Sequence, residues 1–279
     1  MKNRIYLWLV TCFLVIGCQG NHPVETTVLQ GSIDAYSFLF EHLSRSHIAE
    51  DHGIMVGMID GDDISIAVIG NNTFTEDTLF QYGSVTKVIT AHVIAQLAVE
   101  GLIDLDAPLN NYLPDAFQSS QWEKTTIIEL ASHTGGVPRM PGGASESPKF
   151  ALNFDRNALA SAMGSTIVNP GELVSYSNYG YIILGLVIEE ITGLSYAEAV
   201  QERVFDPMGM ETASIHGWRG NDVAPPLNGN GNPSVVVDFD QAASAGALRG
   251  SVTDLLGFLE ASMHACKGCL LYTSDAADE

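Results

Sequence analysis

The sequence predicts an α+β fold in which an antiparallel sheet flanked by helices lies beside a mainly helical lobe. Two β-rich runs occupy residues 53–70, and helical patterns dominate from residue 84 onward. The 279 residues, 46% of them apolar, are enough to bury a large core. Strands followed by a long run of helices favour a sheet layer with a helical lobe beside it.

The first part of the domain predicts one helix and one hairpin. Apolar side chains recur at helical spacing between Ser32 and Glu50, which indicates an amphipathic helix. Residues 53–70 alternate around Asp60-Gly61-Asp62, a turn typical of a β-hairpin. A short strand in "LFQYG", residues 79–83, then leads directly to Ser84.

Helices and loops alternate through the rest of the chain. Two helix starts carry a capping box, Thr126 with Glu129 and Ser195 with Glu198. The predicted helices cover residues 84–102, 126–133, 157–163, 179–191, 195–205 and 253–264. Loops are predicted by segments rich in Gly, Pro and Asn at 103–116, 139–150 and 217–235. A sheet layer of this kind needs more than two or three strands, and no further strand is predicted after residue 83. The shortage of strands favours a truncated chain.

The N-terminus resembles an export signal. Lys2 and Arg4 precede an apolar run that is short for a membrane-spanning helix, and "VIGC" ends at Cys18. This end resembles a bacterial lipoprotein signal, which predicts residues 1–18 as signal, lipidation at Cys18 and residues 19–30 as a polar tether. An ordinary secretory signal or an uncleaved anchor is the alternative. Either way we expect an exported protein, and the lipoprotein reading places it in the bacterial cell envelope, periplasmic or on the surface.

The C-terminal residues 269–279, "CLLYTSDAADE", show no periodicity and resemble a translated sequencing adapter. We therefore expect an incomplete domain over 31–268 and a non-native tail from Cys269. His264, Cys266 and Cys269 suggest a metal cluster at first sight, but Cys269 falls in this tail and no second ligand pair exists. The sequence predicts neither a metal site nor a disulfide framework.

The charge balance limits the possible partners. Twelve basic against 33 acidic residues give a net charge of −21, which repels phosphate backbones and anionic headgroups. We therefore exclude nucleic acid as a partner.

Ser84 and Lys87 form the first candidate site. Residues three apart on a helix share a face, and the helix around Lys87 is apolar on nearly all sides. A buried ammonium has a lowered pKa, so the neutral amine can accept a proton from a neighbouring hydroxyl. A surface lysine extending from a helix end is the alternative. The burial pattern favours an activated serine.

Tyr176 and Asn178 form the second candidate site. In extended backbone, residues two apart project to the same side. A tyrosine near a lysine can relay its proton, and the Asn178 amide can both donate to and accept from a substrate amide. The alternative is a tyrosine at a helix start followed by an asparagine N-cap.

The two candidate motifs and the segments around them resemble, in order and spacing, segments of the class C serine β-lactamase family. The motifs are "SVTK" and "YSN", and the segments are "YGSVTKVITAHVIAQLAVEGLIDLDAPLNNYLP", "IIELASHTGGVP", "YSNYGYIILGLVIEEITGLSYAEAVQERVFDPMGM" and "SAGALRGSVTDLLGFL". That family also contains D,D-carboxypeptidases, D-aminopeptidases and small-ester esterases. The resemblance covers about 53–259 and implies a β-lactamase/transpeptidase-like fold.

The resemblance also implies roles for the candidate residues. Ser84 becomes the acylated nucleophile, Lys87 and Tyr176 the base system, and Asn178 a substrate-binding residue. The family's third motif, Lys- or His-x-Gly, and the strand that supplies the second oxyanion donor do not appear in this sequence. We assign His133 in "SHTGG" to a turn after a capped helix, and His92 to helix packing, rather than to catalysis.

The expected function is acyl transfer through Ser84 on a β-lactam, a D-alanyl peptide of peptidoglycan or a small ester, by a monomer that needs no cofactor. The competing hypotheses are a lipid-anchored penicillin-binding sensor that does not turn over and an inactive truncated homologue. For the chain without its C-terminal strands, we expect poor solubility and little activity.

Overall fold

The computed structural model describes residues 26–30, 53–60, 63–70, 73–141, 170–227, 232–237 and 239–263. The signal with Cys18, the helices predicted at 32–50 and 157–163, and the tail from Cys269 lie outside these ranges. Where the structure is described, no helix is both long and apolar enough to cross a membrane.

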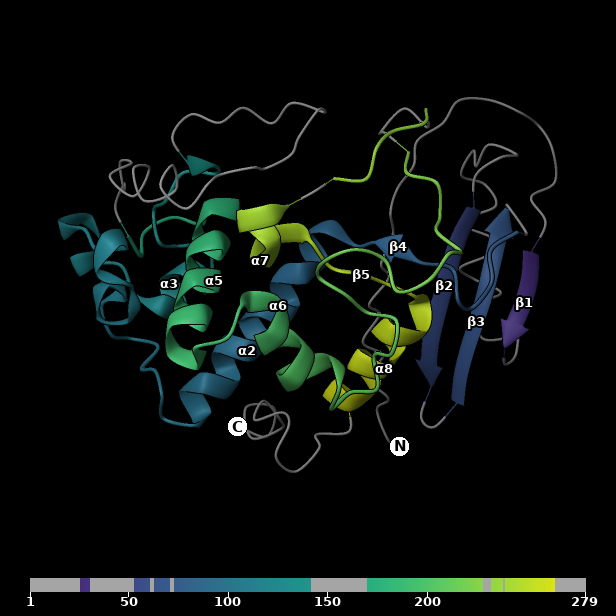
Figure 1. The fold of residues 1–279 in the computed structure, drawn as a ribbon, viewed down its shortest axis with the longest axis horizontal. Coiled ribbons are helices and arrows are strands. Elements are labelled where there is room, and N and C mark those ends of the chain that lie inside the picture. The colour runs from purple at the N-terminus through teal and green to yellow at the C-terminus, as the bar shows by residue number, and fades with distance from the viewer. Residues whose placement is uncertain are drawn as a thin grey trace, which may run out of the picture.

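The three-stranded sheet has the order β1-β3-β2 and is antiparallel throughout, from β1 (Thr26–Gln30), β2 (Gly53–Asp60) and β3 (Asp63–Gly70) (Figure 1). β2 and β3 form the predicted hairpin, with Asp60 opposite Asp63 at its turn end and Gly53 opposite Gly70 at the other. Residues 65–69 of β3 are all buried, as expected of a central strand with an apolar run.

The tether prediction is wrong for residues 26–30. These residues form β1, which pairs with β3 from Thr26 opposite Ile69 to Val28 opposite Ala67. The physical reason is the outer edge of β3, whose unpaired N–H and C=O groups are satisfied by an added strand. The sequence "TTVLQ" also contains three β-branched residues, which suit a strand.

The helical lobe is built around α2 (Thr86–Val99) and α5 (Asn178–Thr192), beside the sheet in Figure 1. The other helices are α3 (Ile127–Ala131), α6 (Tyr196–Val200), α7 (Ala243–Gly246) and α8 (Val252–Met263). The short strands β4 (Phe80–Gln81) and β5 (Arg249–Gly250) pair antiparallel between the lobe and the sheet. β4 is the strand predicted before Ser84.

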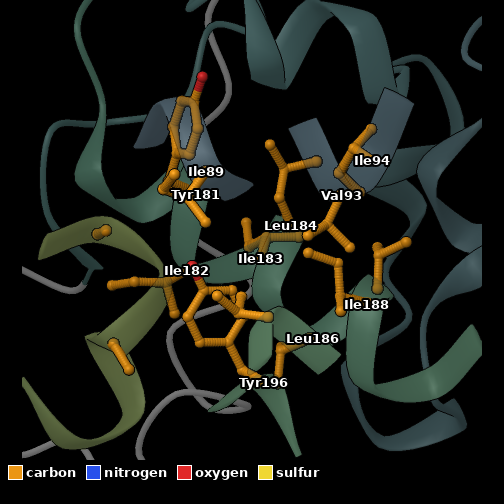
Figure 2. Packing of buried hydrophobic residues seen from close by; sticks show 14 of the residues in the cluster. Ile89, Val93, Ile94, Tyr181, Ile182, Ile183, Leu184, Leu186, Ile188 and Tyr196 are labelled. Atoms are coloured by element: carbon orange, nitrogen blue, oxygen red, sulfur yellow. The ribbon is translucent and has the colours of Figure 1, made fainter. Parts of the chain in front are cut away.

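The core centres on α5, whose residues 179–188 are all buried (Figure 2). Its apolar side chains meet those of α2 and α6, including Ile89, Val93 and Tyr196. Ser177 caps its N-terminus by accepting a hydrogen bond from the Gly180 N–H at 2.9 Å. Gly193, with φ 69°, ends it in the left-handed conformation. A helix apolar on all sides therefore becomes the centre of the lobe.

Both predicted capping boxes are confirmed, at Thr126–Glu129 and Ser195–Glu198. The predicted helix over 195–205 is instead α6 followed by a π-helical turn, Gln201–Phe205. The predicted loop over 103–116 contains the short 3₁₀ turns Leu109–Tyr112 and the start of Asp115–Phe117. A further 3₁₀ turn spans Ser120–Glu123, and another, Asp240–Ala242, leads into α7.

Candidate active site

Ser84 lies in a tight 3₁₀ turn, Gly83–Val85, that joins β4 to α2. Gly83 has φ 54°, a conformation that an L-residue with a side chain rarely adopts. The turn leaves the Ser84 side chain exposed, whereas Lys87, one helical turn later, is only 5% exposed. The chain therefore presents a hydroxyl to solvent above a buried amine.

The Lys87 amine contacts two oxygens. Its Nζ donates to the carbonyl oxygen of Ala245 on α7 at 2.6 Å and lies 3.1 Å from the Ser84 Oγ. No carboxylate in the described part of the chain pairs with it. Burial, and secondarily the positive charge of Arg139, lower the pKa of Lys87 from 10.5 to about 8. The surface-lysine alternative is thus wrong, and a substantial fraction of Lys87 is neutral near pH 8.

Tyr176 completes a triangle with Ser84 and Lys87. Its hydroxyl donates to the Ser84 Oγ at 2.7 Å. The Lys87 Nζ lies 4.9 Å from the centre of the Tyr176 ring and 5.6 Å from that of Tyr181. Tyr176 is 37% exposed, so its ring forms part of the open side of the site. Ser84 and Tyr176, which are 92 residues apart in the sequence, are thus joined by a hydrogen bond at the Ser84 Oγ.

Asn178 is the first residue of α5, and Ser177 rather than Asn178 is the N-cap, so the alternative role suggested for Asn178 is wrong. Its backbone N–H donates to the Arg139 carbonyl at 3.0 Å, and its amide nitrogen lies 3.4 Å from the Met140 Sδ. Asn178 is thus two residues from Tyr176 in the chain, and its side chain lies against Met140. Its substrate-binding role stays a prediction.

The two histidines that were set aside differ in position. His92 packs inside the lobe, with its Nε2 3.1 Å from the Gln96 amide nitrogen and its ring edge-on to Phe258, which confirms the prediction. His133 occupies the predicted turn after α3, with φ 62°. Its ring, however, lies 4.5 Å from that of Tyr176. Sequence reasoning missed this contact.

Arg139 is a further residue that spacing did not reveal. Its guanidinium carbon lies 5.1 Å from the centre of the Tyr176 ring, and its side chain is exposed. The candidate site therefore carries two cations, Lys87 and Arg139, in a strongly acidic protein. Over the residues that the structure describes, no three His, Cys, Asp or Glu side chains group as metal ligands do.

Several known proteins are similar to this chain. The family model described as Beta-lactamase matches residues 52–275. Among curated proteins, the chain is 31% identical over 185 residues to penicillin-binding protein 4 of Amycolatopsis lactamdurans, covering 61% of this chain and 46% of that protein. It is 28% identical over 147 residues to the D-alanyl-D-alanine-carboxypeptidase/endopeptidase AmpH of Escherichia coli strain K12, covering 51% and 38%.

Among solved structures, a class C β-lactamase superposes with a TM-score of 0.72 at 21% identity, covering 84% of this chain and 65% of that one. This likeness shows that the fold is β-lactamase-like, as predicted. The chain spans less than half the length of the two curated relatives above. The family match over residues 52–275, with the fold and the Ser84–Lys87–Tyr176 cluster, shows that this chain belongs to the β-lactamase-related family of serine hydrolases.

Proposed function

We propose that the protein is a serine hydrolase that acts through an acyl-enzyme on Ser84, with a β-lactam, a D-alanyl peptide or a small ester as substrate. The observation that carries the proposal is the position of the Ser84 Oγ, 3.1 Å from the Lys87 Nζ and 2.7 Å from the Tyr176 hydroxyl. A serine in contact with a base of lowered pKa is the arrangement expected of an activated nucleophile.

In acylation, the Ser84 Oγ forms a bond to the substrate carbonyl carbon, and its proton passes to the Lys87 amine directly or through the Tyr176 oxygen. The bond to the leaving group then breaks, and the same proton is returned to that group. With a pKa of about 8, roughly a tenth of Lys87 is neutral at pH 7, which suits a general base. The hydrogen bond to the Ala245 carbonyl holds the amine in place.

In deacylation, a water molecule attacks the ester carbon and gives a proton to the Tyr176 oxygen, while the Tyr176 hydroxyl passes its own proton to the Ser84 Oγ as the ester bond breaks. Tyr176 suits this role because its hydroxyl touches the Ser84 Oγ and part of its side chain is exposed to solvent. The backbone N–H of Ser84 itself lies at the N-terminal end of the helical segment formed by the 3₁₀ turn and α2, where it can stabilise a developing oxyanion.

The relatives support reactivity with peptidoglycan-like acyl donors, since one is named a penicillin-binding protein and another a D-alanyl-D-alanine carboxypeptidase. The same names keep a second candidate open, a penicillin-binding sensor whose acyl-enzyme persists. The two candidates share the acylation step and differ in the lifetime of the ester on Ser84.

Intact-protein mass spectrometry tests the proposal. The protein is mixed with benzylpenicillin or with p-nitrophenyl acetate, and the acylated fraction is followed over time. We expect a single adduct that decays with release of product, and no adduct in Ser84→Ala. Ser262→Ala is the matched control, because the Ser262 hydroxyl bonds to Phe258 within α8, away from Lys87. Adduct on Ser84→Ala would overturn the assignment, and an adduct that never decays would favour the sensor.

We also propose lipidation at Cys18 and export to the cell envelope, from the signal-like first eighteen residues. The name of the carboxypeptidase relative fits a peptidoglycan substrate outside the cytoplasm. Expression with a labelled fatty acid tests this: label should enter the wild-type chain and disappear in Cys18→Ala. Equal labelling of both would rule out Cys18 as the acceptor.

A further inference from the structure

Tyr176 is not held by regular secondary structure. The backbone from Glu172 to Ser177 is irregular, and α5 begins only at Asn178. The residues before it, Leu173 and Val174, are 73% and 78% exposed. A hydroxyl that must stay 2.7 Å from the Ser84 Oγ therefore depends on contacts from another part of the chain.

His133 supplies contacts on both sides of Tyr176. Its backbone carbonyl accepts the Ser175 N–H at 2.8 Å, and its Nδ1 accepts the Ser177 N–H at 3.2 Å. Between these two bonds, its ring packs on the Tyr176 ring at 4.5 Å, tilted by 41°. One residue thus holds the N–H of the residue before Tyr176, the N–H of the residue after it and the Tyr176 ring.

His133 is in turn held firmly. Its backbone N–H donates to the Leu130 carbonyl at 3.2 Å, and its ring lies 5.1 Å from that of Tyr181 on α5. It is the only non-glycine residue with positive φ in the described part of the chain. Such a conformation costs of order 1 kcal/mol and persists only where surrounding contacts determine it.

The contact with Ser177 requires a neutral imidazole, because an Nδ1 that accepts a hydrogen bond carries no proton. Burial, and secondarily the positive charge of Lys87, lower the pKa of His133 and favour this neutral form. The imidazole therefore stays an acceptor at neutral pH.

We propose that His133 is a positioning residue that holds Tyr176 on Ser84 through the Ser175 and Ser177 amides. Its effect on catalysis rests on the proposed function, whereas its effect on the backbone does not. Removing the Nδ1 acceptor releases the Ser177 amide and lets the Tyr176 hydroxyl move away from the Ser84 Oγ. A displacement of this kind lowers the rate of acylation without removing any reacting group.

Two substitutions separate the acceptor from the rest of the side chain. His133→Asn and His133→Gly both lose the ring and both tolerate positive φ, but only asparagine keeps an acceptor atom near the Nδ1 position. Because neither variant is strained, both are expected to fold, and melting temperatures within a few degrees of wild type verify this.

The first readout is amide exchange by NMR at Ser177 and Ser175. We expect exchange at Ser177 to be about tenfold faster in His133→Gly than in His133→Asn, since about one hydrogen bond is lost. Ser175, which bonds to the backbone carbonyl, is the internal reference and should change much less. Equal exchange at Ser177 in the two variants would overturn the proposal.

The second readout is the acylation rate with p-nitrophenyl acetate. His133→Gly should lose about tenfold in the rate constant of acylation, with little change in the ester concentration that gives half-maximal acylation, and His133→Asn should recover most of the rate. If His133→Gly acylates as fast as wild type, His133 does not position Tyr176. If exchange of the Ser177 amide changes as expected but neither the wild type nor the variants become acylated, the hydrogen bond from the Ser177 N–H to His133 is supported and the proposed function fails.

Discussion

The positive charge of Arg139 should contribute to the lowered pKa of the Lys87 amine. Its guanidinium and the Lys87 Nζ each lie about 5 Å from the centre of the Tyr176 ring, so they are at most about 10 Å apart. Removing this cation in Arg139→Gln favours the protonated amine and raises the pKa of Lys87 above about 8.

The size of the effect follows from Coulomb's law. Two unit charges 10 Å apart interact by about 0.4 kcal/mol in bulk water and about 1.7 kcal/mol at an effective dielectric constant of 20. Arg139 is exposed, so the lower part of this range applies. At 1.36 kcal/mol per pKa unit, the pKa of Lys87 should rise by about 0.3 to 0.6.

The assay is the pH dependence of kcat/KM with a neutral ester, because an uncharged substrate does not itself interact with Arg139. Activity rises as Lys87 loses its proton, so the rising limb near pH 8 should move upward by about 0.3 to 0.6, and the rate at pH 7 should fall about two- to fourfold. High salt should reduce the difference between the two proteins.

Arg203→Gln is the matched control. Arg203 pairs with Glu100, the C-cap residue of α2, which lies thirteen residues beyond Lys87 and thus about 20 Å away. Removing the Arg203 charge should leave the rising limb of the kcat/KM profile at the same pH as in the wild type. A limb that stays still or moves to lower pH in Arg139→Gln would refute the charge argument, whereas a change in the plateau alone would point to a lost contact with Tyr176.

Three other substitutions test the packing and the site. Tyr176→Phe removes the hydroxyl from the Ser84 Oγ and should lower kcat/KM for ester hydrolysis by 10²- to 10⁴-fold, the usual contribution of a general acid or base. Gly185→Ala places a methyl group against Ser244, so the free energy of unfolding, measured by chemical denaturation, should fall by about 1 to 3 kcal/mol. Thr126→Ala removes an N-cap and should destabilise by about 0.5 to 2 kcal/mol in the same experiment.

Each of these substitutions has an outcome that contradicts its reasoning. Full activity of Tyr176→Phe would exclude its hydroxyl from the proton relay. An unchanged midpoint in Gly185→Ala would mean that α7 shifts freely away from α5. Equal stability of Thr126→Ala and a Thr126→Ser variant, which keeps the capping oxygen, would show that the hydroxyl does not stabilise α3.

The elements that could be predicted are those whose determinants are neighbours in the chain. The hairpin follows from alternation around Asp60-Gly61-Asp62, and the starts of α3 and α6 follow from capping boxes that span only four residues. The contact of Ser84 with Lys87 is likewise local, because helical geometry places residues three apart on one face.

Other elements depend on partners that the local pattern does not name. β1 forms only because β3 offers an edge, so residues 26–30 read as part of a polar tether. α7, four small residues, becomes a helix where it packs against α5, next to Gly185. Neither segment has a periodicity strong enough to predict its structure.

By itself, the sequence determined that a serine precedes a buried lysine on an apolar helix, and that a tyrosine precedes another such helix. Only the tertiary structure decided that Tyr176 meets Ser84, that Ala245 holds Lys87 across 158 residues, and that His133 holds the backbone around Tyr176. The physical reason is that short-range patterns set the orientation of a side chain within its own element, whereas hydrogen bonds between distant segments form only after the core packs α2, α5 and α7 together.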